Sequence, residues 1–280
     1  MSEEANSNEL SKMLTSSTKR HIAPIFRVDP VKASLYGTKG AVQEQGTITF
    51  VKYQGKCFGL TNQHVIGDVN RPRADAAFML ALDRHTPLPG RLIFSSTPKD
   101  TDFPFDLAVF LLDEESITRG GKVFIELTNE SCPVQESSKY LAVGYPGALR
   151  TETGAQSTHP IFHIVITAML SSDRKLVFQD EVPATDFEMS FGGISGGAIF
   201  DVGEDEKYSI VGIIFQGRGH DDEVEERGSC SDIWVYGVPI DTRLFDRLLA
   251  QVSAAGEPLE LKRLSFQVDI AVGDSGSLAP

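Results

Sequence analysis

Apolar and polar positions alternate over many short stretches of this chain, at the period of β-strands. Thr47–Tyr53 alternates as a half-buried strand does, Gln54-Gly55 makes a turn, and Lys56–Thr61 returns as the second arm of a hairpin. Similar runs, with Gly, Pro, Asn, Asp and Ser between them, occur at residues 76–82, 90–96, 106–112, 140–144, 161–170, 175–179, 197–201, 208–215 and 232–237. Such closely spaced short strands predict an antiparallel sandwich or barrel, and the lack of alternating helices argues against a doubly wound sheet.

One helix is predicted after the strands, over residues 241–254. Leu244, Leu248 and Leu249 fall on one face of this segment, and Asp241 is placed to cap its first turn.

The segment that follows predicts an added strand. Residues 264–272 alternate strictly, with apolar side chains at Leu264, Phe266, Val268, Ile270 and Val272. We expect this strand to pair with an exposed sheet edge, either of its own chain or of a second copy. An unpaired extension is the alternative. Deleting residues 259–280 should therefore change the melting temperature or the mass in solution.

Composition and charge limit the kinds of partner that the protein can bind and indicate its cellular compartment. The formal net charge of -13 disfavours binding to nucleic acid or to an anionic membrane. No apolar run reaches the roughly 18 residues of a membrane span, and the polar N-terminus does not resemble a secretory signal. The cysteines Cys57, Cys132 and Cys230 are odd in number and form no CxxC pair, which indicates a reducing compartment. We therefore expect a cytoplasmic protein that binds neither nucleic acid nor membrane.

The strongest chemical signal is the glycine-rich segment FGGISGG at residues 191–197. A tight turn of this kind can hold the Oγ of Ser195 exposed, while nearby backbone N–H groups point at a developing oxyanion. Taken alone, the segment is equally compatible with a plain glycine turn between two strands.

A nucleophilic serine needs a base, and the base needs a carboxylate. His64 stands where an apolar strand ends and is the candidate base. Asp106 opens the apolar run 106–112, so its carboxylate should be partly buried and in need of a partner. Asp102, four residues earlier, is the competing acid.

These segments resemble, in the same order, the three catalytic blocks of chymotrypsin-fold serine proteases: LTNQHV (60–65), FDLAV (105–109) and GISGGAIF (193–200). The resemblance is greatest to bacterial high-temperature-requirement (HtrA-type) proteases without a PDZ domain, and it covers residues 24–250. It implies a trypsin-like serine endopeptidase with His64, Asp106 and Ser195 as its triad. The N–H groups of Gly193 and Ser195 would form the oxyanion hole.

The resemblance also implies the fold and its divisions. It indicates an all-β chain with two antiparallel six-stranded barrels, chymotrypsin-like, and a C-terminal helix. We expect a polar arm at 1–23, a first barrel at 24–130, a second barrel with the helix at 131–255, and a tail with the added strand at 256–280. Turn residues cluster near 128–138, where the two barrels would meet.

Two departures from the family concern specificity and control. Met189 would form the floor of the primary specificity pocket, with Phe215 and Gly217 as its wall, so apolar side chains of small or medium size should be preferred. Ile194 stands where digestive proteases carry the Asp of their zymogen switch. Restraint must then come from selectivity for a polypeptide substrate or from an activating or regulatory protein partner. The oligomeric state is left open.

Two other functions compete with this interpretation. The spacing Gly193-x-Ser195-x-Gly197 also fits the nucleophile elbow of α/β-hydrolases, but only His220 follows the serine and the alternating helices are missing. A catalytically silent protease fold that serves as a binding module is the second alternative. We expect no cofactor and no metal, because His159 and His163 on one strand would lie about 13 Å apart, too far for shared ligation.

Overall fold

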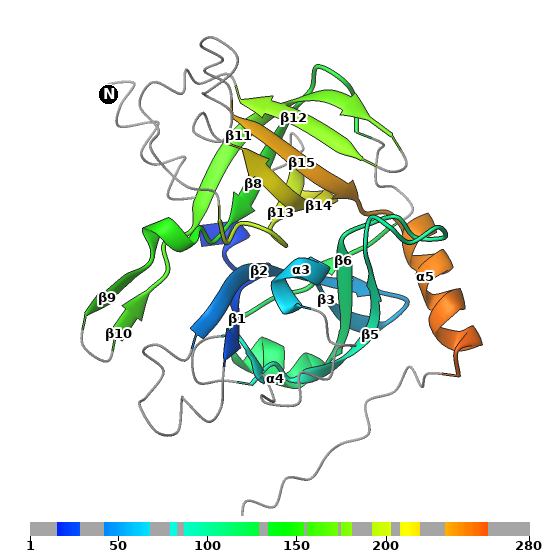
Figure 1. The fold of residues 1–280 in the computed structure, drawn as a ribbon, viewed down its shortest axis with the longest axis horizontal. Helices are drawn as coiled ribbons and strands as arrows, with labels where there is room; N and C mark the ends of the chain where they lie inside the picture. The colour runs from blue at the N-terminus through cyan, green and yellow to red at the C-terminus, as the bar shows by residue number, and fades with distance from the viewer. Residues whose placement is uncertain are drawn as a thin grey trace, which may run out of the picture.

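A computed structural model describes residues 16–28, 42–67, 79–82, 87–128, 134–153, 156–172, 175–180, 192–202, 208–218 and 233–256. Its strands form two units, the first sheet in the lower half of Figure 1 and a barrel above it, with helix α5 at the side. The predicted strand at 264–272, most of the polar arm, and Met189 lie outside the described residues.

The first sheet contains seven strands and follows the N-terminal half of the chain. Its path is β4-β1-β2-β3-β6-β5, with antiparallel neighbours, and the short β7 pairs with β2 in parallel. The strands are β1 (Ile22–Val28), β2 (Val42–Tyr53), β3 (Lys56–Thr61), β4 (Met79–Ala81), β5 (Gly90–Ser96), β6 (Leu107–Leu112) and β7 (Ile125–Glu126). Two short helices, α3 (Gln63–Ile66) and α4 (Glu114–Arg119), follow β3 and β6.

The second unit is a closed antiparallel barrel of six strands in the order β11-β12-β15-β14-β13-β8. Its members are β8 (Lys139–Gly144), β11 (Phe162–Ser171), β12 (Leu176–Asp180), β13 (Ala198–Val202), β14 (Tyr208–Arg218) and β15 (Trp234–Pro239). The turn η1 (Gly147–Leu149) and the small hairpin β9 (Thr151–Thr153) and β10 (Gln156–Thr158) extend from it. The predicted all-β fold with a C-terminal helix is confirmed: one unit is a closed six-stranded barrel as expected, and the other is a seven-stranded sheet. This topology is not that of an α/β-hydrolase.

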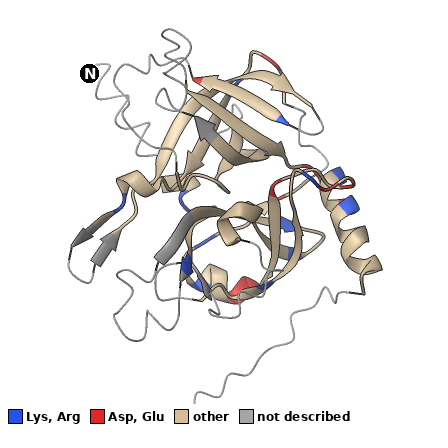
Figure 2. Ribbon diagram, viewed as in Figure 1, with Lys and Arg blue, Asp and Glu red and all other residues tan. Residues whose placement is uncertain are grey.

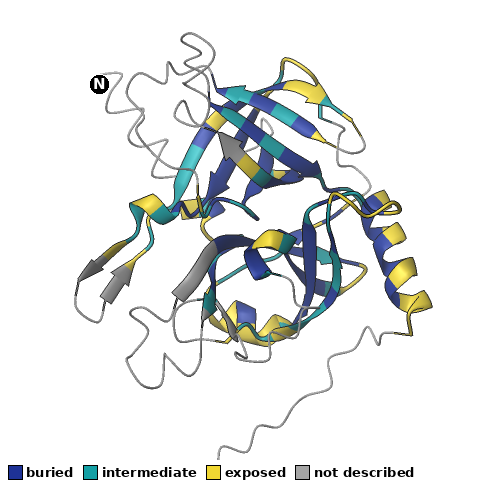
Figure 3. Cartoon of the chain, in the orientation of Figure 1, coloured by how far each residue is buried: buried dark blue, intermediate teal, exposed yellow. Residues whose placement is uncertain are grey.

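One apolar core joins the two units. It contains Phe58 and Leu107 from the first sheet, Val143 and Phe200 from the barrel, and Phe245 from the helix, all at most 2% exposed. Figure 3 shows this burial between the units, whereas charged residues of the described chain lie largely on α4, α5 and connecting loops (Figure 2). Burying aromatic and aliphatic side chains across the boundary holds the two units against each other.

Helix α5 (Thr242–Ala254) forms where the pattern predicts it, and Asp241 caps it by accepting the N–H of Leu244 at 2.7 Å. The helix packs against the first sheet through Phe245, whose ring centroid lies 5.3 Å from that of Phe58 and 5.6 Å from that of Tyr53. Tyr53 also donates its hydroxyl to Asp246 at 2.7 Å. No helix among the described residues is both long and apolar enough to span a membrane.

The prediction that β2 is half-buried is wrong at the strand's centre. Thr47 and Thr49 are fully buried, like the apolar Ile48 and Phe50 that alternate with them. The two threonines face the barrel instead of solvent, because their side chains and backbone bind a turn of the second unit.

Candidate active site

His64 is held at the end of β3 by a single helical turn. Val65 and Ile66 of α3 are buried and anchor this turn, while the side chain of His64 is 50% exposed. The preceding Asn62 is buried and donates its side-chain amide to the backbone oxygen of Asp106 at 2.6 Å. This bond ties the turn that carries the imidazole to the segment that carries the carboxylate.

Asp106 uses both carboxylate oxygens on His64. Its Oδ2 lies 2.5 Å from His64 Nδ1, and its Oδ1 accepts the backbone N–H of His64 at 3.2 Å. The carboxylate is 14% exposed, and the β6 residues that follow it are buried. Two contacts to one residue fix the orientation of the ring, and a proton on Nδ1 leaves Nε2 as the acceptor toward the cleft. The competing Asp102 does not line this cleft.

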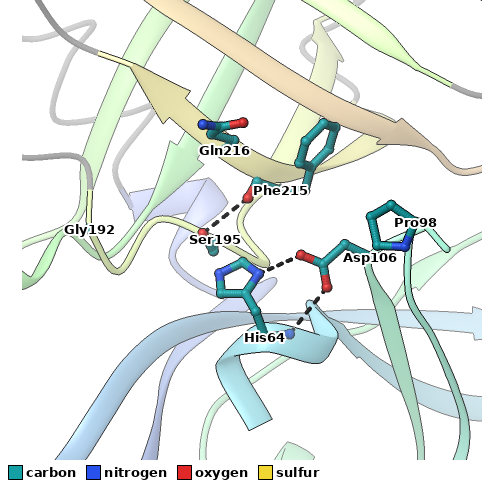
Figure 4. Close-up of a pocket in the computed structure, with 7 residues that line it drawn as sticks. All are labelled: His64, Pro98, Asp106, Gly192, Ser195, Phe215 and Gln216. Atoms are coloured by element: carbon teal, nitrogen blue, oxygen red, sulfur yellow. Dashed lines mark hydrogen bonds and ion pairs between the residues drawn. The ribbon is translucent and has the colours of Figure 1, made fainter. Parts of the chain in front are cut away.

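Ser195 faces the same cleft from the barrel. The cleft has a volume of about 440 Å³ and is lined by His64, Pro98, Asp106, Gly192, Ser195, Phe215 and Gln216. Figure 4 shows Ser195 beside the His64 imidazole, with its Oγ turned toward the backbone oxygen of Phe215 at 3.4 Å. In the part of the chain that the structure describes, no hydrogen bond joins Ser195 Oγ to His64. Rotation about the Cα–Cβ bond is the motion that moves Oγ between these neighbours.

The peptide groups that carry the N–H of Gly193 and the N–H of Ser195 are each held by a hydrogen bond to their carbonyl oxygen. Gly192 O accepts the N–H of Gly147 at 2.6 Å, and Ile194 O accepts the N–H of Gly197 at 2.8 Å. In a trans peptide the N–H points opposite to the C=O, so the N–H groups of Gly193 and Ser195 are directed away from these anchors. Within the described chain, neither N–H donates to a backbone oxygen.

Gly193 is the position where this turn requires glycine. Its φ is +97°, and a Cβ there would lie 2.7 Å from Gly147 N and 2.8 Å from Tyr145 O. An L side chain would therefore be strained and would push against the segment that anchors Gly192.

The predicted specificity residues are only partly brought together. Phe215 lines the cleft, and its ring lies against Tyr236 at 6.1 Å between centroids. Gly217 lies farther along β14, opposite Val235 of β15. Met189 lies outside the described residues, so the floor of the pocket stays a prediction.

Sequence reasoning missed two residues that line the cleft and two buried residues behind the turn that carries Ser195. Pro98 and Gln216 line the cleft, and Thr47 and Thr49 hold the turn that carries Ser195. Pro98 and Gln216 carry no motif of their own. The two threonines carry no signal beyond the β-branched shape that favours strands, and that shape does not identify a partner.

Comparisons with known proteins give two similar solved structures. No family model matches the chain, and no curated protein matches it. A thermostable serine protease, AL20, from an extremophilic microorganism is 17% identical, with a TM-score of 0.47, over 84% of this chain and 97% of that one. A structure concerned with coupled folding and binding of the intrinsically disordered Sesbania mosaic virus VPg protein is 18% identical, with a TM-score of 0.41, over 78% and 85%.

Proposed function

We propose that this protein is a trypsin-like serine endopeptidase that hydrolyses peptide bonds through an acyl-enzyme. The observation that carries the proposal is the 2.5 Å contact between His64 Nδ1 and Asp106 Oδ2, in the cleft that Ser195 also lines. A histidine fixed by a carboxylate on one nitrogen, with its other nitrogen toward a serine, is the arrangement that nucleophilic catalysis by serine needs.

In the first half of the reaction, Ser195 Oγ attacks the carbonyl carbon of the scissile peptide. His64 Nε2 takes the hydroxyl proton as the bond forms and then gives it to the leaving amine, so the amine departs neutral. In the second half, water replaces the amine: His64 removes its proton, the hydroxide attacks the acyl carbon, and Ser195 leaves with the proton returned to its oxygen.

Asp106 keeps the imidazole in the tautomer that this sequence requires and stabilises the imidazolium that forms between the two proton transfers. The N–H groups of Gly193 and Ser195 are the proposed donors to the tetrahedral oxyanion. Their peptides are anchored before substrate arrives, so little reorganisation is needed during reaction. Catalytic hydrogen bonds are often long or poorly aligned in enzymes without substrate, and substrate should draw Ser195 Oγ from Phe215 O toward His64.

Labelling with a fluorophosphonate probe tests the proposal without knowledge of the substrate. The wild type should form one covalent adduct per chain, and Ser195→Ala should form none. His64→Ala should label more slowly by several powers of ten, because the serine loses its base. Melting temperatures close to that of the wild type are the control for folding. If the wild type does not label, or if Ser195→Ala labels equally, the chain is not a serine hydrolase and the silent binding module becomes the better explanation.

We propose a preference for small or medium apolar side chains at the cleavage site. Phe215 lines the cleft, and Met189 and Gly217 complete the uncharged pocket that the sequence predicts. An apolar pocket offers no partner for a buried Arg or Lys. A peptide-library profile dominated by Arg or Lys at this site would contradict the assignment of the pocket.

We also propose a relationship to HtrA-type proteases and a cytoplasmic location. The resemblance to HtrA-type proteases rests on the sequence blocks named above. A reducing, cytoplasmic location is supported by cysteine usage: the three cysteines are odd in number and form no CxxC pair, and Cys57 is a free, buried thiol whose pKa burial raises to about 12. Cell fractionation with antibody detection tests the location, and recovery from an oxidising compartment would contradict it.

A further inference from the structure

The turn that carries Ser195 is anchored through every one of its backbone carbonyl groups from Gly192 to Gly197. Six consecutive carbonyl oxygens, from Gly192 to Gly197, each accept a hydrogen bond. The donors, in order, are Gly147 N, Thr47 Oγ1, Gly197 N, Thr47 N, Thr49 Oγ1 and Ile214 N. Three of these six bonds come from β2, which belongs to the first sheet and not to the barrel that contains the turn.

Thr47 donates two of the three hydrogen bonds that β2 makes to the turn. Its backbone N–H donates to Ser195 O at 2.8 Å, and its hydroxyl donates to Gly193 O at 3.0 Å. Thr47 is fully buried, and its own carbonyl accepts the hydroxyl of Thr61 at 2.7 Å. Thr47 is therefore held in β2 by a contact that does not involve the turn.

The hydroxyl of Thr47 also accepts the backbone N–H of Tyr145 at 3.0 Å. A threonine hydroxyl has one proton and two lone pairs, so it can donate to Gly193 and accept from Tyr145 together. Two residues after Tyr145, Gly147 N–H binds Gly192 O at 2.6 Å. Thr47 Oγ1 thus closes a ring that contains residues 145–147 and the peptides on both sides of Gly193.

We propose that Thr47 is a positioning residue for the oxyanion hole, acting through the orientation of the Gly193 and Ser195 peptides. This inference rests on the proposed function, because the two N–H groups are the proposed oxyanion donors. Holding Gly192 O, Gly193 O and Ser195 O leaves the peptides around both donors little freedom to rotate. Loss of the hydroxyl leaves the buried Tyr145 N–H and the part-buried Gly193 O without this partner and opens the hydrogen-bonded ring.

Thr49 provides a matched comparison on the same strand. It is equally buried, and its hydroxyl donates to Gly196 O at 2.8 Å. The peptide that contains this oxygen carries the N–H of Gly197, which is not a proposed oxyanion donor. Removal of either hydroxyl should reduce stability, but only removal of the Thr47 hydroxyl should loosen a donor.

The experiment compares Thr47→Val, Thr47→Ser and Thr49→Val by fluorophosphonate labelling over a range of probe concentrations. We expect Thr47→Val to lower the maximal labelling rate about 10- to 100-fold, with half-saturation changed less than about threefold. Thr47→Ser keeps the hydroxyl and should recover most of the rate. Thr49→Val should lose less than about threefold, although its melting temperature falls by a similar amount. Equal rates for both valine variants, or no recovery with serine, would overturn the inference.

Hydrogen exchange measured by mass spectrometry separates this inference from the proposed function. In Thr47→Val, amides of residues 192–197 should exchange faster than in Thr49→Val, whether or not the protein is an enzyme. Unchanged exchange there would refute the positioning role even if labelling slowed. Equal labelling of wild type and Ser195→Ala would refute the proposed function and leave the exchange result to decide on Thr47.

Discussion

The first sheet contributes two interacting side chains to the cleft, whereas the barrel contributes Ser195 on a turn that is anchored through its backbone. From the first sheet come the imidazole of His64 and the carboxylate of Asp106, joined by two contacts. From the barrel comes the glycine-rich turn around Ser195, whose peptide groups are anchored one after another. The two units therefore depend on different properties of their residues.

This difference predicts opposite sensitivities. The first sheet should fail when the chemistry of a side chain changes while its shape is kept. The barrel turn should fail when atoms are added while the chemistry is kept. Conservative substitutions test this contrast better than large truncations, because they change one property at a time.

Among the conservative substitutions, the largest effect is expected for Asp106→Asn, which keeps the shape of the side chain and removes its charge. The amide can offer an N–H to Nδ1, which places the imidazole proton on Nε2. A protonated Nε2 cannot accept the proton of the Ser195 hydroxyl. We expect the labelling rate to fall about 10³- to 10⁴-fold with little change in melting temperature. A loss below tenfold would mean that the first sheet does not act through this carboxylate.

A smaller loss is expected for Gly193→Ala, which adds one methyl group and no new chemistry. The methyl would press on Gly147 N and Tyr145 O at a φ of +97°. We expect the labelling rate to fall about 10²-fold, the effect of losing one oxyanion donor.

Gly55→Ala is the control for backbone strain at the Gly193 position. Gly55 also has a positive φ, +71°, but a Cβ there would meet nothing within 4 Å. It should lose stability to a similar conformational strain and keep the labelling rate. Equal labelling by the two alanine variants would remove the distinction between the units.

The smallest effect is expected for the pH dependence of the unfolding free energy, through Lys122 in the first unit. Lys122 donates to the carbonyl oxygens of Lys19 and Ile22, and burial, followed by the charge of Lys19, lowers its pKa from 10.5 to about 8. Between these values the unfolded chain binds the proton and the folded chain does not, so stability rises with pH. Unfolding free energies from pH 7 to 10.5 should show this contribution, as a difference from Lys122→Met, in wild type and in the exposed-loop variant Lys99→Met; the opposing contribution of Cys57, whose raised pKa lowers stability above about pH 9, is common to all three proteins. Lys122→Met should lack it, and a rise of equal size in that variant would contradict the assignment.

Local signals explain how much of the fold and site the sequence could predict. The strands and α5 follow hydrophobic periods, and Asp241 caps the helix as expected. His64, Asp106 and Ser195 could be named because each stands at the end of an apolar run or in a glycine turn. The first unit is less regular than predicted, because β7 adds a parallel strand that its two residues could not reveal.

Thr47 shows why the rest could not be predicted. On an alternating strand its polar side chain reads as solvent-facing, because the pattern reports only the period. Its partner Gly193 lies 146 residues away. A buried hydroxyl is stable only with such a partner, and one sequence does not show which distant backbone group supplies it.

The contact between α5 and the first sheet has a consequence for biosynthesis. Tyr53 leaves the ribosome early, but Asp246, which accepts its hydroxyl, is made 193 residues later. At roughly 5–20 residues per second, the nascent first sheet must wait about ten to forty seconds for its covering helix. Apolar aromatic surface stays open during that time, so this chain should be a client of chaperones that act at the ribosome. The same delay keeps any hydrolytic centre incomplete until nearly all of its supporting structure has been synthesised.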